Sequence, residues 1–133
     1  MTLPYKSYIT ADDILKYKGY RLDKVLATDH SGSTNETIEH FLLEVASVVY
    51  NCVLETCNRQ EMAEFICTSE DFENLIARCQ LEQAVYILEN SNLLSMANLK
   101  EGADIKEIRK VRSYSPLMLN ELKASRIFFG GRY

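Results

Sequence analysis

The sequence is poor in glycine and proline, the residues that shape phosphate-binding loops and sharp turns. Only five of its 133 residues are glycine and two are proline, and Gly102, Gly130 and Gly131 lie away from any predicted turn between a strand and a helix. It contains no glycine-rich phosphate loop, no H-E-x-x-H or G-x-S-x-G motif, and no group of carboxylates with metal-ligand spacing. We therefore expect no enzymatic activity, no bound metal and no cofactor.

The cysteines also lack the spacing of a metal site. Among Cys52, Cys57, Cys67 and Cys79 there is no C-x-x-C pair, and no histidine lies near them in the sequence. Two of them fall at core positions of predicted helices, so we interpret all four as small buried hydrophobic residues with reduced thiols. A cysteine-dependent enzyme is an alternative, and it requires one thiol with a lowered pKa.

Signals for a membrane or for secretion are absent as well. No stretch approaches the roughly 18 consecutive apolar residues that a membrane-spanning helix needs. The first residues, Met1 to Lys6, lack the charged start and apolar run of a secretory signal. We expect a protein that folds in a cytoplasm without contacting a membrane. Its length suits one domain whose core needs no metal or disulfide.

The clearest positive signal is the segment from Asn35 to Cys57, the longest without proline or glycine. Its apolar residues recur at the spacing of an α-helix face, and Ser33 and Glu36 form a predicted capping box at its start. A second apolar flank lies beside the first face. Such a helix is either central in its own fold or also covered by a partner, and the sequence leaves both open. The first face holds Ile38, Phe41, Leu42, Val45, Val48, Val49, Cys52 and Val53, and the flank holds Leu43, Ala46, Tyr50 and Leu54.

Further helices are predicted on both sides of this segment. A second long helix begins near Ser69, ends near Asn90 to Asn92, and is the expected antiparallel partner of the first. Residues 105–112 fit either a helix or a strand. The expected fold is mainly α: a small helical bundle with two long antiparallel helices, short flanking helices and extended N- and C-terminal arms, divided into a helical domain (1–124) and a docking tail (125–133). The short helices are expected from Thr10 to Gly19, at Leu22 to Leu26, after a capping signal that begins at Asn58, and from Ser115 to about Ala124. The helix after Asn58 has Met62, Phe65 and Ile66 as apolar residues, and the last one has Ser115 as its N-cap and Pro116 at its first position.

Charge is distributed unevenly along the chain. Residues 1–99 carry seven Lys/Arg against 15 Asp/Glu, whereas residues 100–133 carry eight against four. An acidic body therefore ends in a basic arm, which is suited to nucleic acid, to an acidic protein surface or to the acidic body of a neighbouring copy. A solvated charged face is the simpler interpretation of this arm. Its candidate contact residues are Lys106, Arg109, Lys110 and Arg112.

The last residues form an unusual mixture of large apolar, glycine and arginine residues. Left exposed, Ile127, Phe128 and Phe129 would promote aggregation, so we expect them to dock either on the protein's own core or on another subunit or partner. In the second case the arginines supply polar or charged contacts. The candidate partner-binding residues are Arg126, Ile127, Phe128, Phe129, Gly130, Gly131, Arg132 and Tyr133.

The order of these features resembles the small head-tail connector, or adaptor, proteins of tailed bacteriophages. Ile9 to Tyr17 looks like their short first helix after a T-x-x-D-type cap, and Asn35 to Val53 looks like their long second helix. Phe72 to Asn90 is similar to the helix that packs on it. Tyr114 to Leu122, followed by Ile127 to Gly131, resembles their closing short helix and aromatic-glycine tail. Residues 98–112 are more basic and have no matching pattern.

The resemblance implies a structural virion protein without catalytic activity. Members of this family form a ring, dodecameric in the virion, below the portal protein, where they extend the channel for packaged DNA and join head to tail. The implied partners are the portal protein, other tail or neck proteins, further copies of the chain and the DNA in the channel, with assembly in the host cytoplasm. Ile127, Phe128 and Phe129 would be the anchors, with Arg126 and Arg132 as charged companions.

Two roles remain open for the basic segment. In a connector, Lys106, Arg109, Lys110 and Arg112 would face channel DNA or the portal. The alternative function is a small helical nucleic-acid-binding regulator, in which residues 100–112 extend from an acidic, dimerising body and bind phosphates without reading bases.

Overall fold

The computed structural model describes residues 3–26, 35–90 and 113–125, and within these ranges the chain is helical with no strand. The predicted mainly α bundle is confirmed. The predicted capping box at Ser33, the undecided segment 105–112 and the docking tail lie outside the described residues. In chain order the elements are α1 (Ala11–Lys18), α2 (Leu22–Val25), α3 (Asn35–Cys57), α4 (Gln60–Thr68), the 3-10 helix η1 (Glu70–Phe72), α5 (Glu73–Asn90) and α8 (Pro116–Ser125).

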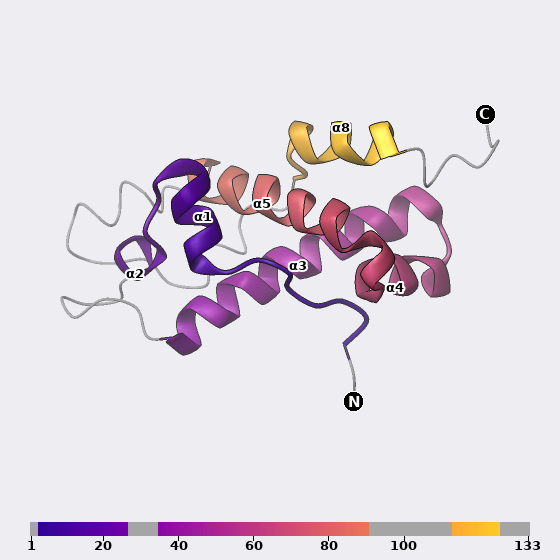
Figure 1. Cartoon of the computed structure of the whole chain (residues 1–133). Helices are drawn as coiled ribbons and strands as arrows, with labels where there is room; N and C mark the ends of the chain where they lie inside the picture. The colour runs from indigo at the N-terminus through magenta and orange to yellow at the C-terminus, as the bar shows by residue number, and fades with distance from the viewer. Residues whose placement is uncertain (1–2, 27–34, 91–112, 126–133) are drawn as a thin grey trace.

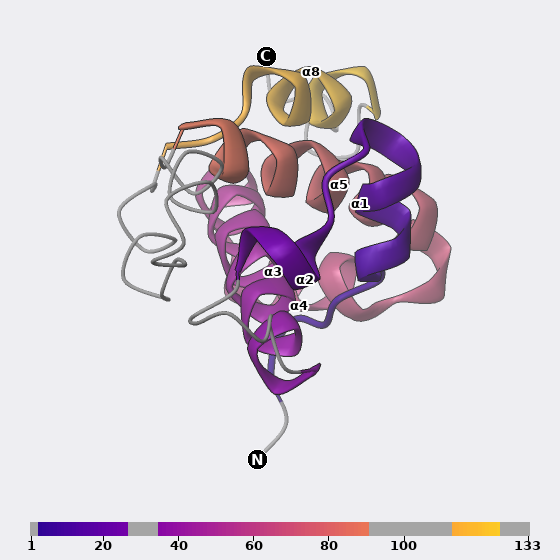
Figure 2. The same cartoon turned by 90° about the vertical axis from the view of Figure 1, so that its left-hand side faces the viewer.

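The two long helices form the frame of the bundle, and the short ones pack around it. In Figure 1 the chain crosses the molecule along α3, turns through α4 and returns along α5, so that α3 and α5 are antiparallel as predicted. α8 lies along the outer side of α5, as both views show (Figures 1 and 2). α1 and α2 lie at the end of the bundle where α3 begins, and α4 lies at the opposite end.

The helix ends follow local capping rules. Thr10 and Asp13 form a reciprocal capping box at α1, in which the Asp13 amide donates to Thr10 Oγ1 (3.3 Å) and the Thr10 amide donates to Asp13 Oδ2 (2.8 Å). Gly19 ends α1 with φ 79°, a left-handed conformation that costs glycine little. At α8 the Met118 amide donates to Ser115 Oγ (3.4 Å), so the predicted serine cap before Pro116 is confirmed.

One predicted cap is wrong. Asn58 does not start α4; it ends α3, with φ 54° and its amide donating to the Leu54 carbonyl (2.7 Å). Asparagine tolerates this left-handed conformation better than most residues with a side chain. Arg59 is the residue that precedes α4, and its side chain makes no capping hydrogen bond.

The core consists of two clusters joined along α3 and α5. The first contains Phe41 of α3 and Ile87 of α5, with Ile14 of α1, and the second contains Ile66 of α4 and Met118 of α8 with the other halves of the long helices. All five of these side chains are fully buried. α1 and α2 contribute to the first cluster and α4 and α8 to the second, so each pair packs on one half of the frame.

α3 is central in its own fold. On the flank for which the sequence left a partner possible, Ala46 and Tyr50 are buried, Leu54 is half-buried and only Leu43 reaches 36% exposure. The N-terminal arm, residues 3–10, supplies part of the cover, since the Tyr5 ring lies 5.6 Å from the Tyr50 ring. A partner is therefore not needed to cover this helix.

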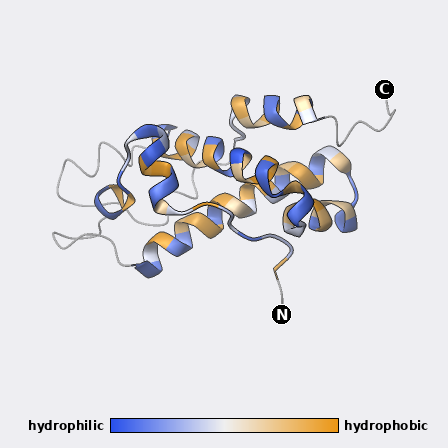
Figure 3. Ribbon diagram, viewed as in Figure 1, coloured by the Kyte–Doolittle hydropathy of each residue, from blue (hydrophilic) through white to orange (hydrophobic). Residues whose placement is uncertain are grey.

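α3 is also the most apolar helix described, as its colouring in Figure 3 shows over most of its length. Length and composition alone would allow it to cross a membrane, because its most apolar 18 residues have a mean hydropathy of 1.3. Of that window, 44% is buried inside the protein. A buried core helix passes the same test, so this property is weak evidence for a membrane.

Two buried glutamines on α5 hold the extended segments on either side of the bundle. Gln80 accepts from the Tyr8 amide (2.8 Å) and donates to the Lys6 carbonyl (2.8 Å). Three residues later, Gln83 accepts from the Ser115 amide (2.8 Å) and donates to the Ser113 carbonyl (3.1 Å). Each glutamine side chain thus forms hydrogen bonds to one backbone N–H and one backbone carbonyl in a segment outside the helices.

Candidate interaction surface

α4 buries one face and leaves the other apolar face uncovered. Ala63, Ile66 and Cys67 point into the second core cluster and are at most 1% exposed. Met62 and Phe65, one turn apart on the outer face, are 41% and 52% exposed. Met62, Phe65 and Ile66 are the apolar residues predicted for this helix, but only Ile66 is in the core.

Phe72 extends this apolar face beyond α4. Its ring meets the Phe65 ring edge-on, with centroids 5.9 Å apart and an interplanar angle of 81°. The geometry is one of those that aromatic pairs prefer. Ser69 positions Phe72 by capping η1, because Ser69 Oγ accepts from the Asp71 amide (3.2 Å). The rings are therefore held in place before any partner arrives.

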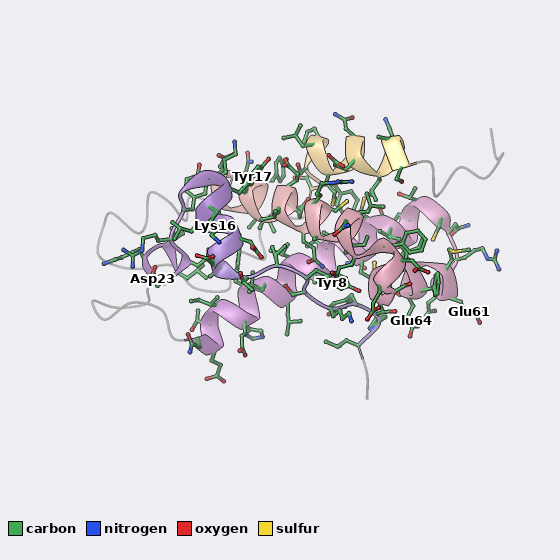
Figure 4. The ribbon with its side chains drawn as sticks, in the orientation of Figure 1. Tyr8, Lys16, Tyr17, Asp23, Glu61 and Glu64 are labelled. Atoms are coloured by element: carbon green, nitrogen blue, oxygen red, sulfur yellow. The ribbon has the colours of Figure 1, made fainter. Side chains whose placement is uncertain are left out.

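Exposed carboxylates lie close in sequence to the exposed apolar side chains. Between residues 59 and 73 the chain has one basic residue, Arg59, and five acidic ones, all of them exposed. A shallow hollow of about 460 Å³ lies at the start of α4, lined by Arg59, Gln60, Glu61 and Glu64. Figure 4 labels Glu61 and Glu64 at this end of the molecule. We call the surface formed by Glu61, Met62, Glu64, Phe65 and Phe72, with Glu70, Asp71 and Glu73 at its edge, the α4 patch.

The other exposed large apolar residues are more scattered. Leu117 on α8 is the most exposed of them, at 56%, while Met118 and Leu122 on the same helix are buried. The rest come from the N-terminal arm, α1 and α3. Single exposed apolar residues are normal on protein surfaces, whereas neighbouring ones ringed by charge are typical of contact sites. The α4 patch is therefore the stronger candidate.

The site residues named from the sequence lie outside the described residues. This holds for the basic set Lys106, Arg109, Lys110 and Arg112, and for the tail from Arg126 to Tyr133. Both sets stay predictions. The sequence did not predict the α4 patch, because Met62, Phe65 and Ile66 have the same helical spacing as the buried Ala63, Ile66 and Cys67. The pattern alone does not show which of these two stripes is buried.

Tyrosine–carboxylate pairs elsewhere on the surface serve to join helices. The Tyr17 hydroxyl donates to Glu82, which raises the pKa of Tyr17 to about 12, and the Tyr20 hydroxyl donates to Glu89 (2.7 Å). Both bonds attach the α1–α2 region to α5 (Figure 4 labels Tyr17). Among the described residues no three histidine, cysteine, aspartate or glutamate side chains are arranged to hold a metal ion.

The surroundings of the cysteine thiols do not favour nucleophilic reactivity. All four cysteines are buried and free, and all belong to the second core cluster. Burial raises the pKa of Cys52 to about 11 and the pKa values of Cys67 and Cys79 to about 12. A reactive cysteine needs a lowered pKa and access to solvent, so this cluster is suited to packing.

We expect the native thiols to react slowly with a thiol reagent at neutral pH. Burial keeps the reagent away from all four thiols, and the raised pKa values of Cys52, Cys67 and Cys79 leave little of their thiolate forms. The native rate should therefore be at least about a hundredfold below the rate in denaturant. Cys57, at 9% exposure the most accessible of the four, should react first. Ellman's reagent with and without guanidinium measures both rates. One native thiol that reacts as fast as in the denatured chain would revive the cysteine-enzyme alternative.

Comparison of the chain with protein-family models, with curated proteins and with solved structures found no match to any of them.

Proposed function

We propose that this protein is a structural assembly protein, a head-tail connector of a tailed bacteriophage that forms a ring below the portal. The observation that carries the proposal is the α4 patch, because Met62 and Phe65 face solvent on a helix whose other side is packed, and Phe65 contacts the half-buried Phe72 of η1 edge-on. Uncovered apolar surface of this kind is typical of proteins that bind other proteins.

The order of the helices supports the same function. A short capped helix, a long central helix, an antiparallel helix and a closing short helix occur at the positions where the resemblance to connectors places them. The two ends of the bundle are formed by different helices, α4 and α8 at one and α1 and α2 at the other. A subunit of a ring could use such different surfaces to contact different neighbours. The formation of a ring, the number of copies in it and its DNA channel are part of the proposal.

The charge of the described residues favours a protein partner over nucleic acid for the body. They contain eight Lys/Arg and 15 Asp/Glu, so the phosphate backbone would be repelled by the bundle as a whole. The regulator alternative depends on residues 100–112, outside the described ranges. A mobility-shift titration against salt separates the two functions. A regulator should bind short duplex DNA below about 1 μM with a steep salt slope, and a free connector should bind little.

The direct experiment is electron microscopy of the full-length protein mixed with the portal protein of its phage. A connector should add a ring of density coaxial with the portal, on the side that faces the tail. The portal alone, imaged under the same conditions, is the control. If no density is added to the portal at any protein concentration, and none is found in the neck of the assembled particle, the proposal fails.

A further inference from the structure

We propose that the α4 patch binds the C-terminal tail, residues 125–133, of a neighbouring copy of this protein. This inference rests on the proposed ring, and it names the surface that each copy would offer to the next. It assigns a receptor to the tail, for which the sequence alone left the protein's own core and an unspecified partner as alternatives.

The chemistry of the two segments is complementary. The tail places Arg126 before Ile127, Phe128 and Phe129, and it places Arg132 after the glycine pair. On α4 a glutamate precedes one exposed apolar residue in each of two steps, Glu61 before Met62 and Glu64 before Phe65. Arginine–carboxylate pairs at the edge of an apolar contact are common where proteins bind one another.

The hollow beside these side chains gives one arginine a place to bind. Its walls include both Glu61 and Glu64, and its volume of about 460 Å³ is open to solvent. A guanidinium entering it would meet two carboxylates in a fork geometry that lysine cannot match. Arg59 also lines the hollow, so the hollow takes one added positive charge more readily than two.

The tail leaves the bundle at the end that carries the patch. α8 ends at Ser125, and its Met118 and Leu122 share the second core cluster with Ala63 and Ile66 of α4. Figure 1 shows the ends of α8 and α4 on the same side of the molecule. The tail therefore begins at the end of the bundle that carries the receptor surface.

The two surfaces differ, so their contact is heterologous. A heterologous contact repeats from copy to copy, and it closes into a ring when the rotation between neighbours allows closure. A two-fold dimer would instead need one surface that is complementary to itself. The rings of Phe65 and Phe72 already contact each other edge-on, so they would lose little freedom when the tail binds them.

The test uses three full-length variants in solution, without the portal. One reverses the patch (Glu61→Arg with Glu64→Arg), one reverses the tail (Arg126→Glu with Arg132→Glu), and the third combines both. A matched control, Glu36→Arg with Glu39→Arg, reverses two exposed glutamates of the same spacing at the start of α3. Circular dichroism confirms that each variant is folded, and sedimentation velocity over a range of concentrations measures association.

We expect the wild-type protein and the control to associate with a dissociation constant of about 1–100 μM. Each single reversal should weaken association about ten- to a hundredfold, and the combined variant should recover most of the loss. An equimolar mixture of the two single reversals should associate about as strongly as the wild type, because the wild-type tail fits the wild-type patch and the reversed tail fits the reversed patch.

Two results would overturn the inference. If the reversals have no more effect than the control, the tail does not bind the α4 patch. If the wild-type protein stays monomeric at all concentrations while the mixture of reversals pairs, the tail occupies the patch of its own chain. The portal experiment is independent of these measurements, so failure of the proposed function and failure of this contact can be told apart.

Discussion

Replacing Gln83 with leucine is expected to lower the free energy of unfolding by about 2–4 kcal/mol, a large part of the stability of a domain of this size. Gln83 is fully buried on α5, and its side-chain amide makes hydrogen bonds to the backbone at Ser113 and Ser115. Leucine fills a similar volume but leaves the Ser115 amide, in a residue that is only 2% exposed, without its partner. A buried donor that loses its acceptor bears its full desolvation cost.

Urea denaturation followed by circular dichroism measures this change. The matched control is Gln60→Leu, which places the same substitution on an exposed position of α4 and should alter stability by no more than about 0.5 kcal/mol. Protease sensitivity near α8 should rise in Gln83→Leu, because the same glutamine holds the start of that helix against α5. Equal stability of the two variants would mean that these hydrogen bonds do not hold α8 in solution.

Deleting residues 125–133 is expected to abolish the joining of heads to tails while leaving the body folded. The described core clusters are completed by residues up to Leu122, so the bundle should keep its helicity and lose no more than about 1 kcal/mol of stability. Loss of the tail removes the anchors that the proposed function requires. Complementation of a phage lacking this protein, scored by infectious particles, measures the effect, which should exceed about a hundredfold.

A conservative variant separates the contribution of the tail's chemistry from that of its length. Ile127→Ser, Phe128→Ser and Phe129→Ser together keep the chain length and should match the deletion. Arg126→Lys with Arg132→Lys keeps both charges but loses the guanidinium fork, so its activity should fall between those of the wild type and the deletion. Unfolding of the body on deletion would show that the tail belongs to the core. Normal particle yield from the deleted protein would remove the tail from the assembly mechanism.

Helix positions followed from the sequence because their causes are local. The α3 boundaries, Asn35 and Cys57, match the prediction, and the caps at Thr10, Gly19 and Ser115 act on residues within one turn of themselves. The antiparallel pairing of α3 and α5 also followed, since short connections bring two long apolar helices together. Where two local signals overlapped, as at Asn58, the sequence did not show which helix the residue would serve.

By itself the sequence determined the helices, the apolar stripe of each one and the separation of an acidic body from a basic end. Only the tertiary structure decided which apolar surface stays uncovered: the flank of α3 is buried, and the outer face of α4 is not. The tertiary structure also brought Gln80 and Gln83 to the backbone groups that they bind, which lie 72 and 32 positions away in the chain, respectively. The reason is physical, because helix formation depends on neighbours within a few residues, whereas burial depends on which distant segments reach the same face.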